Sequence, residues 1–183
     1  FVLLAATSVF SQARSEPLYS TSFEDFPAGM LEQHADGKVV WKALGKSEIT
    51  DKYHKTGSRA LHLFGGTANT LELRLEGQLQ RSKGIRFEAE RWTSKSPFQF
   101  RVLAETSGGW NEISNLDELV IVGRGFHSHV VLKLPEGAPI TGLRLVGTAP
   151  EDAGILIDDF ALLSETPKDV AKVPKVATEP IAK

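Results

Sequence analysis

The chain has 183 residues, a length that fits a single domain with short tails. Its formal net charge is −2 at pH 7, with both signs spread along the chain, so there is no electrostatic reason to expect nucleic acid or an anionic membrane as a partner. Cysteine is absent, which excludes disulfides and thiolate metal sites.

The N-terminal segment, residues 1–13, is an uncharged apolar run that ends at Ser11-Gln12-Ala13. A short apolar run before a small-x-small site is typical of the end of a secretory signal peptide, and it is too short to span a bilayer. We therefore expect a truncated signal peptide cleaved after Ala13, no membrane insertion, and a secreted, periplasmic or cell-surface location in a bacterium. The alternative is a buried N-terminal strand.

Residues 14–163 form the expected folded body. Apolar and polar residues alternate there in short runs separated by Gly, Pro, Asn and Asp, which is the period-two pattern of half-buried strands. The predicted strands are residues 18–23, 39–43, 59–64, 70–76, 85–92, 98–105, 116–122, 126–134, 140–146 and 155–163. They predict an all-β fold, specifically a two-sheet antiparallel β-sandwich of the jelly-roll type.

Residues 164–183 differ in composition, with three prolines and almost no large apolar side chains. Proline fixes φ and removes a backbone donor, so the segment favours an extended, solvated chain. We interpret it as a linker to a further C-terminal domain; the alternative is a plain disordered tail.

Three short motifs, at residues 22–29, 57–63 and 155–160, join the two ends of the body. Their order resembles carbohydrate-binding β-sandwich modules and their galactose-binding-like and concanavalin-like relatives. The resemblance implies that the first and last strands lie side by side. It also implies a structural Ca²⁺ held by Glu24, by Asp158 or Asp159, and by carbonyls of the turn at residues 55–58, since calcium takes six to eight oxygen ligands.

The positions of the two aspartates on a strand also suggest a buried carboxylate. Asp158 and Asp159 should face opposite ways on a strand, so that one carboxylate points to the apolar interior. A buried carboxylate needs a cation or several hydrogen-bond donors. The alternative to calcium is that this carboxylate accepts loop amides or pairs with Arg59.

The outward positions of the central strands suggest a binding face. If the apolar residues point inward, planar polar side chains and a tryptophan share outer faces, as a sugar-binding groove requires. The predicted carbohydrate-binding residues are Arg86, Glu88, Trp92, Arg101, Trp110, His127 and His129. The plainer alternative is a solvated strand face with cross-strand charge pairs.

Two tryptophans and two histidines have further possible roles. Trp110 follows two glycines and is expected on a loop or strand start, as a sugar platform or as a lid over the core edge. Trp41 is expected in the core. His127 and His129 have the spacing of two zinc ligands on one strand, but two exposed surface histidines are the simpler interpretation.

A second, finer resemblance concerns residues 84–93 and 97–101, which are similar to N-terminal modules of secreted bacterial sialidases. The chain lacks the Asp-box repeat and the arginine-bearing F-R-I-P start of the sialidase catalytic domain. The resemblance therefore implies a catalytic propeller beyond Lys183.

Catalytic motifs are absent from the sequence: it holds no G-x-S-x-G elbow, H-E-x-x-H, P-loop or dinucleotide fingerprint. We expect a non-catalytic carbohydrate-binding module of a secreted glycoside hydrolase, with a sialidase as the specific version. Its partners would be a glycan and the C-terminal domain of the same polypeptide. The alternatives are a structural or protein-interaction sandwich and a stand-alone enzyme.

Overall fold

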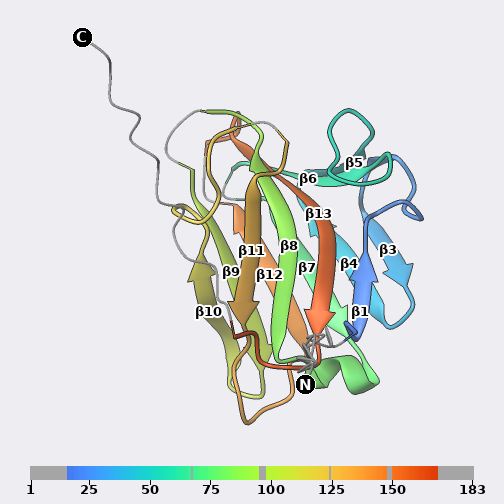
Figure 1. The fold of residues 1–183 in the computed structure, drawn as a ribbon, viewed down its shortest axis with the longest axis vertical. Helices are drawn as coiled ribbons and strands as arrows, with labels where there is room; N and C mark the ends of the chain where they lie inside the picture. The colour runs from blue at the N-terminus through green and yellow to red at the C-terminus, as the bar shows by residue number, and fades with distance from the viewer. Residues whose placement is uncertain (1–15, 67, 95–97, 124, 148–149, 169–183) are drawn as a thin grey trace, which may run out of the picture.

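The computed structural model describes residues 16–66, 68–94, 98–123, 125–147 and 150–168. These residues form two antiparallel β-sheets packed face to face, as the sequence predicts (Figure 1). The first sheet has the order β11-β8-β13-β6-β5-β2, with β1 also paired to β13. The second sheet has the order β10-β9-β12-β7-β4-β3.

The strands of the first sheet are β1 (Tyr19–Thr21), β2 (Gly29–Met30), β5 (Ser47–Thr50), β6 (Ala60–Phe64), β8 (Gly84–Arg91), β11 (Ser128–Lys133) and β13 (Gly154–Leu163). Those of the second sheet are β3 (Gln33–Asp36), β4 (Val39–Leu44), β7 (Thr70–Leu75), β9 (Phe100–Thr106), β10 (Gly109–Asn115) and β12 (Gly142–Gly147). A short 3₁₀ helix, η1 (Gly77–Arg81), joins β7 to β8.

The chain changes sheets at most of its connections. It crosses between β2 and β3, between β4 and β5, at each step from β6 to β9, and at each step from β10 to β13. β1 pairs with β13, with Thr21 opposite Phe160, so the first and last strands do lie side by side as expected. Consequently, the outward-facing residues of consecutive strands often lie on opposite sides of the sandwich.

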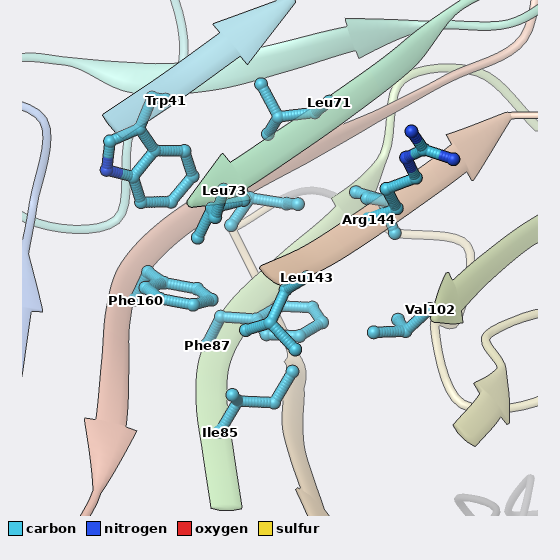
Figure 2. A pocket seen from close by; sticks show the side chains of 11 residues that line it. Trp41, Leu71, Leu73, Ile85, Phe87, Val102, Leu143, Arg144 and Phe160 are labelled. Atoms are coloured by element: carbon cyan, nitrogen blue, oxygen red, sulfur yellow. The ribbon is translucent and has the colours of Figure 1, made fainter. Parts of the chain in front are cut away.

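Alternating apolar side chains from both sheets fill the space between them. Ile85 and Phe87 of β8 and Leu71 and Leu73 of β7 are among the buried residues of this core. Trp41 is 1% exposed, which confirms the prediction that it is a core residue. These side chains converge between the two sheets (Figure 2). They leave a void of about 30 Å³, which is too small for a sugar ring.

The predicted strand at residues 116–122 is wrong. Leu116 and Val120 are both fully buried, but they lie in a turn in which the amides of Leu119 and Val120 donate to the carbonyl of Leu116. Apolar residues four apart reach the core from one side of such a turn, so apolar content alone misled the prediction. The strands β2, β3, β5 and β10 were not predicted.

The two tails are mostly outside the described residues. The expected signal peptide, residues 1–13, lies entirely outside them, and the expected linker is described only to residue 168. There, Pro167 lies against the start of β8, because a Cβ on Gly84 would come within 2.7 Å of its Cδ. Among the described residues, no helix has the length and hydrophobicity that a membrane crossing needs.

Candidate functional site

The residues predicted to bind carbohydrate lie on two opposite faces of the sandwich. Arg86 and Glu88 lie on β8 and His129 on β11, in the first sheet, with Trp92 and His127 just beyond these strands. Two further residues belong to the second sheet: Arg101 lies on β9 and Trp110 on β10. The expectation of one shared groove is therefore corrected, because the chain crosses to the other sheet between β8 and β9.

Trp110 lies on the outer face of the second sheet, on the edge strand β10. Its ring extends from the edge strand β10 toward β12, where a Cβ on Gly142 would come 3.0 Å from its Cη2. The guanidinium carbon of Arg144 lies 4.0 Å from the ring centroid, and that of Arg74 lies 5.5 Å away. Two arginines thus flank the indole in cation–π geometry.

Carboxylates hold both arginines in place. Glu72 accepts a hydrogen bond of 2.7 Å from Nε of Arg74 and another of 2.7 Å from Nε of Arg144. Arg74 also donates to Glu105, which accepts from the hydroxyl of Thr141 at 2.8 Å. Burial opposes the ionisation of Glu72, but the hydrogen bonds and charges of Arg144 and Arg74 outweigh it and lower its pKa. The side chains are therefore pre-organised.

We call this surface the tryptophan–arginine face. It comprises Trp110, Arg74, Arg101, Arg144, Glu72, Glu105 and Glu112, all on the outer side of β10, β9, β12 and β7. Figure 2 shows Arg144 pointing away from the core side chains. Among the described residues, Arg144 donates a hydrogen bond to Glu72 through Nε, and no protein acceptor takes its terminal nitrogens.

Sequence reasoning missed Arg74, Arg144 and Glu72 as members of this face. The alternation of β7 and β12 marks them as outward-facing, and that signal is visible in the sequence. What it cannot show is that β7 and β12 are neighbours, with Arg144 opposite Glu72 and Gly142 opposite Arg74.

The outer face of the first sheet carries a polar hollow of about 640 Å³. Its lining brings together residues from both predicted sets, namely Arg86, Glu88 and His129 from the sugar set and Glu24 and Asp159 from the metal set. Nδ1 of His129 lies 2.6 Å from Oε1 of Glu88. These members of the two sets are therefore adjacent parts of one surface.

Glu24 anchors the turn before β6. Its Oε1 accepts the backbone amides of Ser58 and Arg59, each at 2.8 Å, and its Oε2 accepts the Ser58 hydroxyl at 2.7 Å. The hydrogen bonds from Ser58 are the main reason that the pKa of Glu24 is lowered. Gly57 is required here, since its φ is +60° and a Cβ would come 2.3 Å from Oε1 of Glu24.

Asp158 anchors the same turn from the other side. Its Oδ2 accepts the amides of Lys55 at 2.7 Å and Thr56 at 3.0 Å, and its Oδ1 accepts the amide of Asp159 at 2.7 Å. The hydroxyl of Thr56 donates to Asp159 at 2.6 Å. Asp158 is fully buried, and burial raises its pKa despite these donors.

Neither aspartate points into the space between the sheets, which corrects the sequence argument. Asp158 pairs with Glu88, and the register of β13 shifts between Asp158 and Ala161. Asp159 has a left-handed φ of 48°, and after it Phe160 enters the core. Because a bulge interrupts the alternation, Asp158 is buried beneath the turn that it anchors instead.

The arrangement of these groups does not fit a calcium ion. Amide hydrogens point at the carboxylate oxygens that calcium would need, and Arg59 donates to the carbonyls of Glu24 and Phe26 at 2.7 and 2.6 Å. Within the described residues there is no group of three or more His, Asp, Glu or Cys side chains arranged to hold a metal. The geometry corresponds to the amide-accepting alternative, with Arg59 bound to backbone carbonyls. We call the hydrogen bonds that Glu24 and Asp158 accept from the turn at residues 55–59 the carboxylate clasp.

We expect the carboxylate clasp to stabilise the fold without metal. Thermal unfolding of the chain should be the same in calcium and in EDTA, whereas Asp158→Ala should cost about 2–3 kcal/mol, because buried amides lose a charged acceptor. Asp25→Asn, at the exposed neighbour of Glu24, is the matched control and should change little. A melting temperature that falls in EDTA and recovers with calcium would contradict this interpretation.

The two other predicted residues of the first sheet lie apart from the polar hollow. Trp92, at the end of β8, stacks on His62 with ring centroids 4.2 Å apart. His127 is exposed and lies near Gly123 and Gly125, and the described residues give it and His129 no third metal ligand.

His62, which the sequence analysis did not single out, is fully buried. Its Nδ1 lies 3.1 Å from Glu48, while its Nε2 has no hydrogen-bond partner among the described residues. Burial lowers its pKa.

Comparison with known proteins identifies no matching family model and no matching curated protein. Solved structures do match. The C-terminal family 22 carbohydrate-binding module of Clostridium thermocellum Xyn10B is 16% identical with a TM-score of 0.53, covering 84% of this chain and 96% of that one. The K2 cleaved adhesin domain of Lys-gingipain is 15% identical with a TM-score of 0.52, covering 79% and 98%.

A family 29 carbohydrate-binding module, a point mutant of CBM29-2 in complex with mannohexaose, is 11% identical with a TM-score of 0.50, covering 75% of this chain and 89% of that one. At such low identities these matches show a shared fold. They confirm the predicted sandwich and place it among the folds used by carbohydrate-binding modules.

Proposed function

We propose that this chain is a non-catalytic carbohydrate-binding module that holds a glycan on the tryptophan–arginine face. The observation that carries the proposal is Trp110 flanked by Arg74 and Arg144, with both guanidinium groups fixed by Glu72. An indole offers an apolar surface to a sugar ring, and fixed planar donors and acceptors suit its hydroxyl groups.

The ligand class follows from the charges of the face. Arg74, Arg101 and Arg144 are matched by three carboxylates, and Arg101 lies 3.3 Å from Glu112. Because each positive group already has a negative partner, an anionic sugar would meet carboxylates as well as guanidinium groups. We therefore propose a neutral glycan, which agrees with the mannohexaose bound by the family 29 module.

The setting of the module remains a proposal that rests on the sequence. The apolar N-terminus supports a secreted, periplasmic or cell-surface bacterial protein, and the proline-bearing C-terminal segment supports a following domain. A glycoside hydrolase would gain from such a module, since tethering raises the local concentration of the enzyme on its polymer. A sialidase is the specific parent that the resemblance of residues 84–93 and 97–101 suggests.

A structural or protein-interaction module is the second candidate function. It is favoured by the likeness to the adhesin domain of Lys-gingipain, which shares this fold. A docking surface of that kind is expected to be a contiguous apolar patch. The exposed large apolar residues of the described chain are spread over β2, the end of β4 and two loops, at Met30, Leu44, Tyr53 and Val122.

A glycan array with the 183-residue chain tests the proposal. We expect binding to neutral oligosaccharides of several units, equally in calcium and in EDTA, and little binding to acidic glycans. Silence of a broad array, with circular dichroism showing a folded protein, would favour the interaction module. Release of reducing ends from any bound glycan would contradict the non-catalytic assignment.

A further inference from the structure

A second hollow lies at the loop end of the first sheet, on the opposite side of the sandwich from the tryptophan–arginine face. Its volume is about 280 Å³, and its lining includes Tyr53, Glu90, Trp92, Thr93, Val122 and Leu156. We call it the aromatic hollow. Small-molecule pockets usually span about 300–1,000 Å³, so this one is the size for a single small ring.

Two aromatic side chains form a corner of the aromatic hollow. Trp92 stacks on the buried imidazole of His62 at an interplanar angle of 24°, which fixes the indole against the sheet. Tyr53 meets Trp92 edge-on, with ring centroids 5.4 Å apart and an interplanar angle of 86°. Tyr53 is 40% exposed, so the corner is open to solvent.

The last residues of β8 hold the opposite wall in place. Glu90, only 7% exposed, accepts the amides of Gly125 at 2.6 Å and Phe126 at 3.0 Å. Arg91 donates to the carbonyls of Val120 at 2.6 Å and Asp117 at 2.5 Å. These bonds fix residues on both sides of Val122, so this wall of the hollow is held in place before any ligand arrives.

The floor of the aromatic hollow is apolar. Leu156 belongs to a small apolar cluster that is separate from the main core. In this cluster it is grouped with Ala60 and Phe126, and Trp92 packs against them. The hydroxyl of Thr93 and the carboxylate of Glu90 add hydrogen-bonding groups beside this apolar floor. A sugar ring has the same combination of an apolar face and a polar edge.

We propose that the aromatic hollow binds a single sugar residue, as a second glycan site independent of the tryptophan–arginine face. The two sites would differ in what they recognise. The open face of the second sheet suits the length of a chain, whereas a hollow of about 280 Å³ suits one terminal unit.

The three tryptophans of the chain make the test direct, because each reports on a different place. Trp41 is in the core, Trp110 is on the tryptophan–arginine face, and Trp92 is in the aromatic hollow. Indole N–H signals of the ¹⁵N-labelled full chain would be assigned with single Trp→Phe variants. The probes are xylose, mannose, galactose and N-acetylglucosamine, with mannohexaose for the other face and glycerol as a polyol without a ring.

We expect at least one monosaccharide to shift the Trp92 signal in a saturable way, while Trp41 and Trp110 stay unchanged and glycerol has no effect. Tyr53→Ala should weaken this binding by about three- to tenfold, the usual value of an aromatic contact. Met30→Ala, which removes an exposed apolar side chain on β2, should leave it unchanged.

The outcomes separate the two proposals. A silent Trp92 signal with all four sugars, in a protein whose Trp110 responds to mannohexaose, overturns the second site and leaves the proposed function standing. A Trp92 shift with a silent Trp110 supports the second site and contradicts the tryptophan–arginine face. Binding at Trp92 with unchanged affinity in Tyr53→Ala also overturns the assignment of the hollow.

Discussion

Replacing Trp110 with alanine should weaken glycan binding by at least about 30-fold, the loss expected when an aromatic side chain at the centre of an interface is removed. The variant removes the ring that the sugar would contact and the surface on which the guanidinium of Arg144 stacks. Titration calorimetry with the best glycan of the array measures the change. Trp110→Phe, which keeps an aromatic ring, should lose less.

A matched pair of arginine variants provides the control. Arg144→Ala removes donors from the tryptophan–arginine face, whereas Arg86→Ala removes the same side chain from the polar hollow of the other sheet. We expect binding to fall only with Arg144→Ala. If Arg86→Ala is the damaging variant, the polar hollow is the glycan site and the proposed face is wrong.

The strands that bury one face only were predictable from the sequence. In β8, Ile85, Phe87 and Ala89 are buried and alternate with Arg86 and Glu88, which line the polar hollow. A period of two in hydrophobicity follows directly from that arrangement. The same reasoning found β7, β9 and β11, and it assigned Trp41 to the core.

The edge strand β10 gave no such signal. In β10 every residue from Gly109 to Asn115 is partly or fully exposed, because one side of the strand lacks a neighbour and neither face is deeply buried. Neither face of the strand has to be apolar, so its sequence does not alternate between apolar and polar residues. Trp110 was therefore placed on a loop or strand start, while its position over β12 depends on pairings made far along the chain.

The composition of the candidate sites could be predicted only in part. Alternation identifies Arg86 and Arg101 as outward-facing, but not that a crossover puts them on opposite sheets. The motifs around Glu24 and Asp158 correctly brought these residues to one corner. Which groups donate hydrogen bonds to these two carboxylates depends on the path of the turn at residues 55–59. Four backbone amides of this turn point toward them.

The largest loss of stability is expected from Trp41→Ala, with a decrease of about 3–5 kcal/mol in the free energy of unfolding. Trp41 is the largest fully buried side chain of the described residues, and it packs edge-on against Phe23, Phe26 and Phe160, with ring centroids 5.1 to 5.8 Å apart. Alanine would leave a cavity that these rings cannot close. Urea unfolding should show a lower midpoint with an unchanged slope.

Trp41 also stabilises the fold through a hydrogen bond, and this contribution can be measured separately from its packing. Its Nε1 donates to the hydroxyl of Tyr19 at 3.0 Å, and that hydroxyl donates to Asp36 at 2.6 Å. Burial, followed by the hydrogen bond to Asp36, raises the pKa of Tyr19, so the hydroxyl stays protonated and remains a donor. Trp41→Phe keeps an aromatic ring and loses the N–H, so its cost should be smaller than that of Trp41→Ala.

Tyr19→Phe should cost about 1 kcal/mol, because it removes only the hydroxyl between the two partners. The surface variant Trp110→Ala, with the same change of side chain as Trp41→Ala, should leave the unfolding midpoint nearly unchanged while it weakens glycan binding. If Trp41→Ala instead cost less than about 1 kcal/mol, the two sheets would not be packed around this ring, and the arrangement of strands that positions both proposed glycan sites would have to be revised.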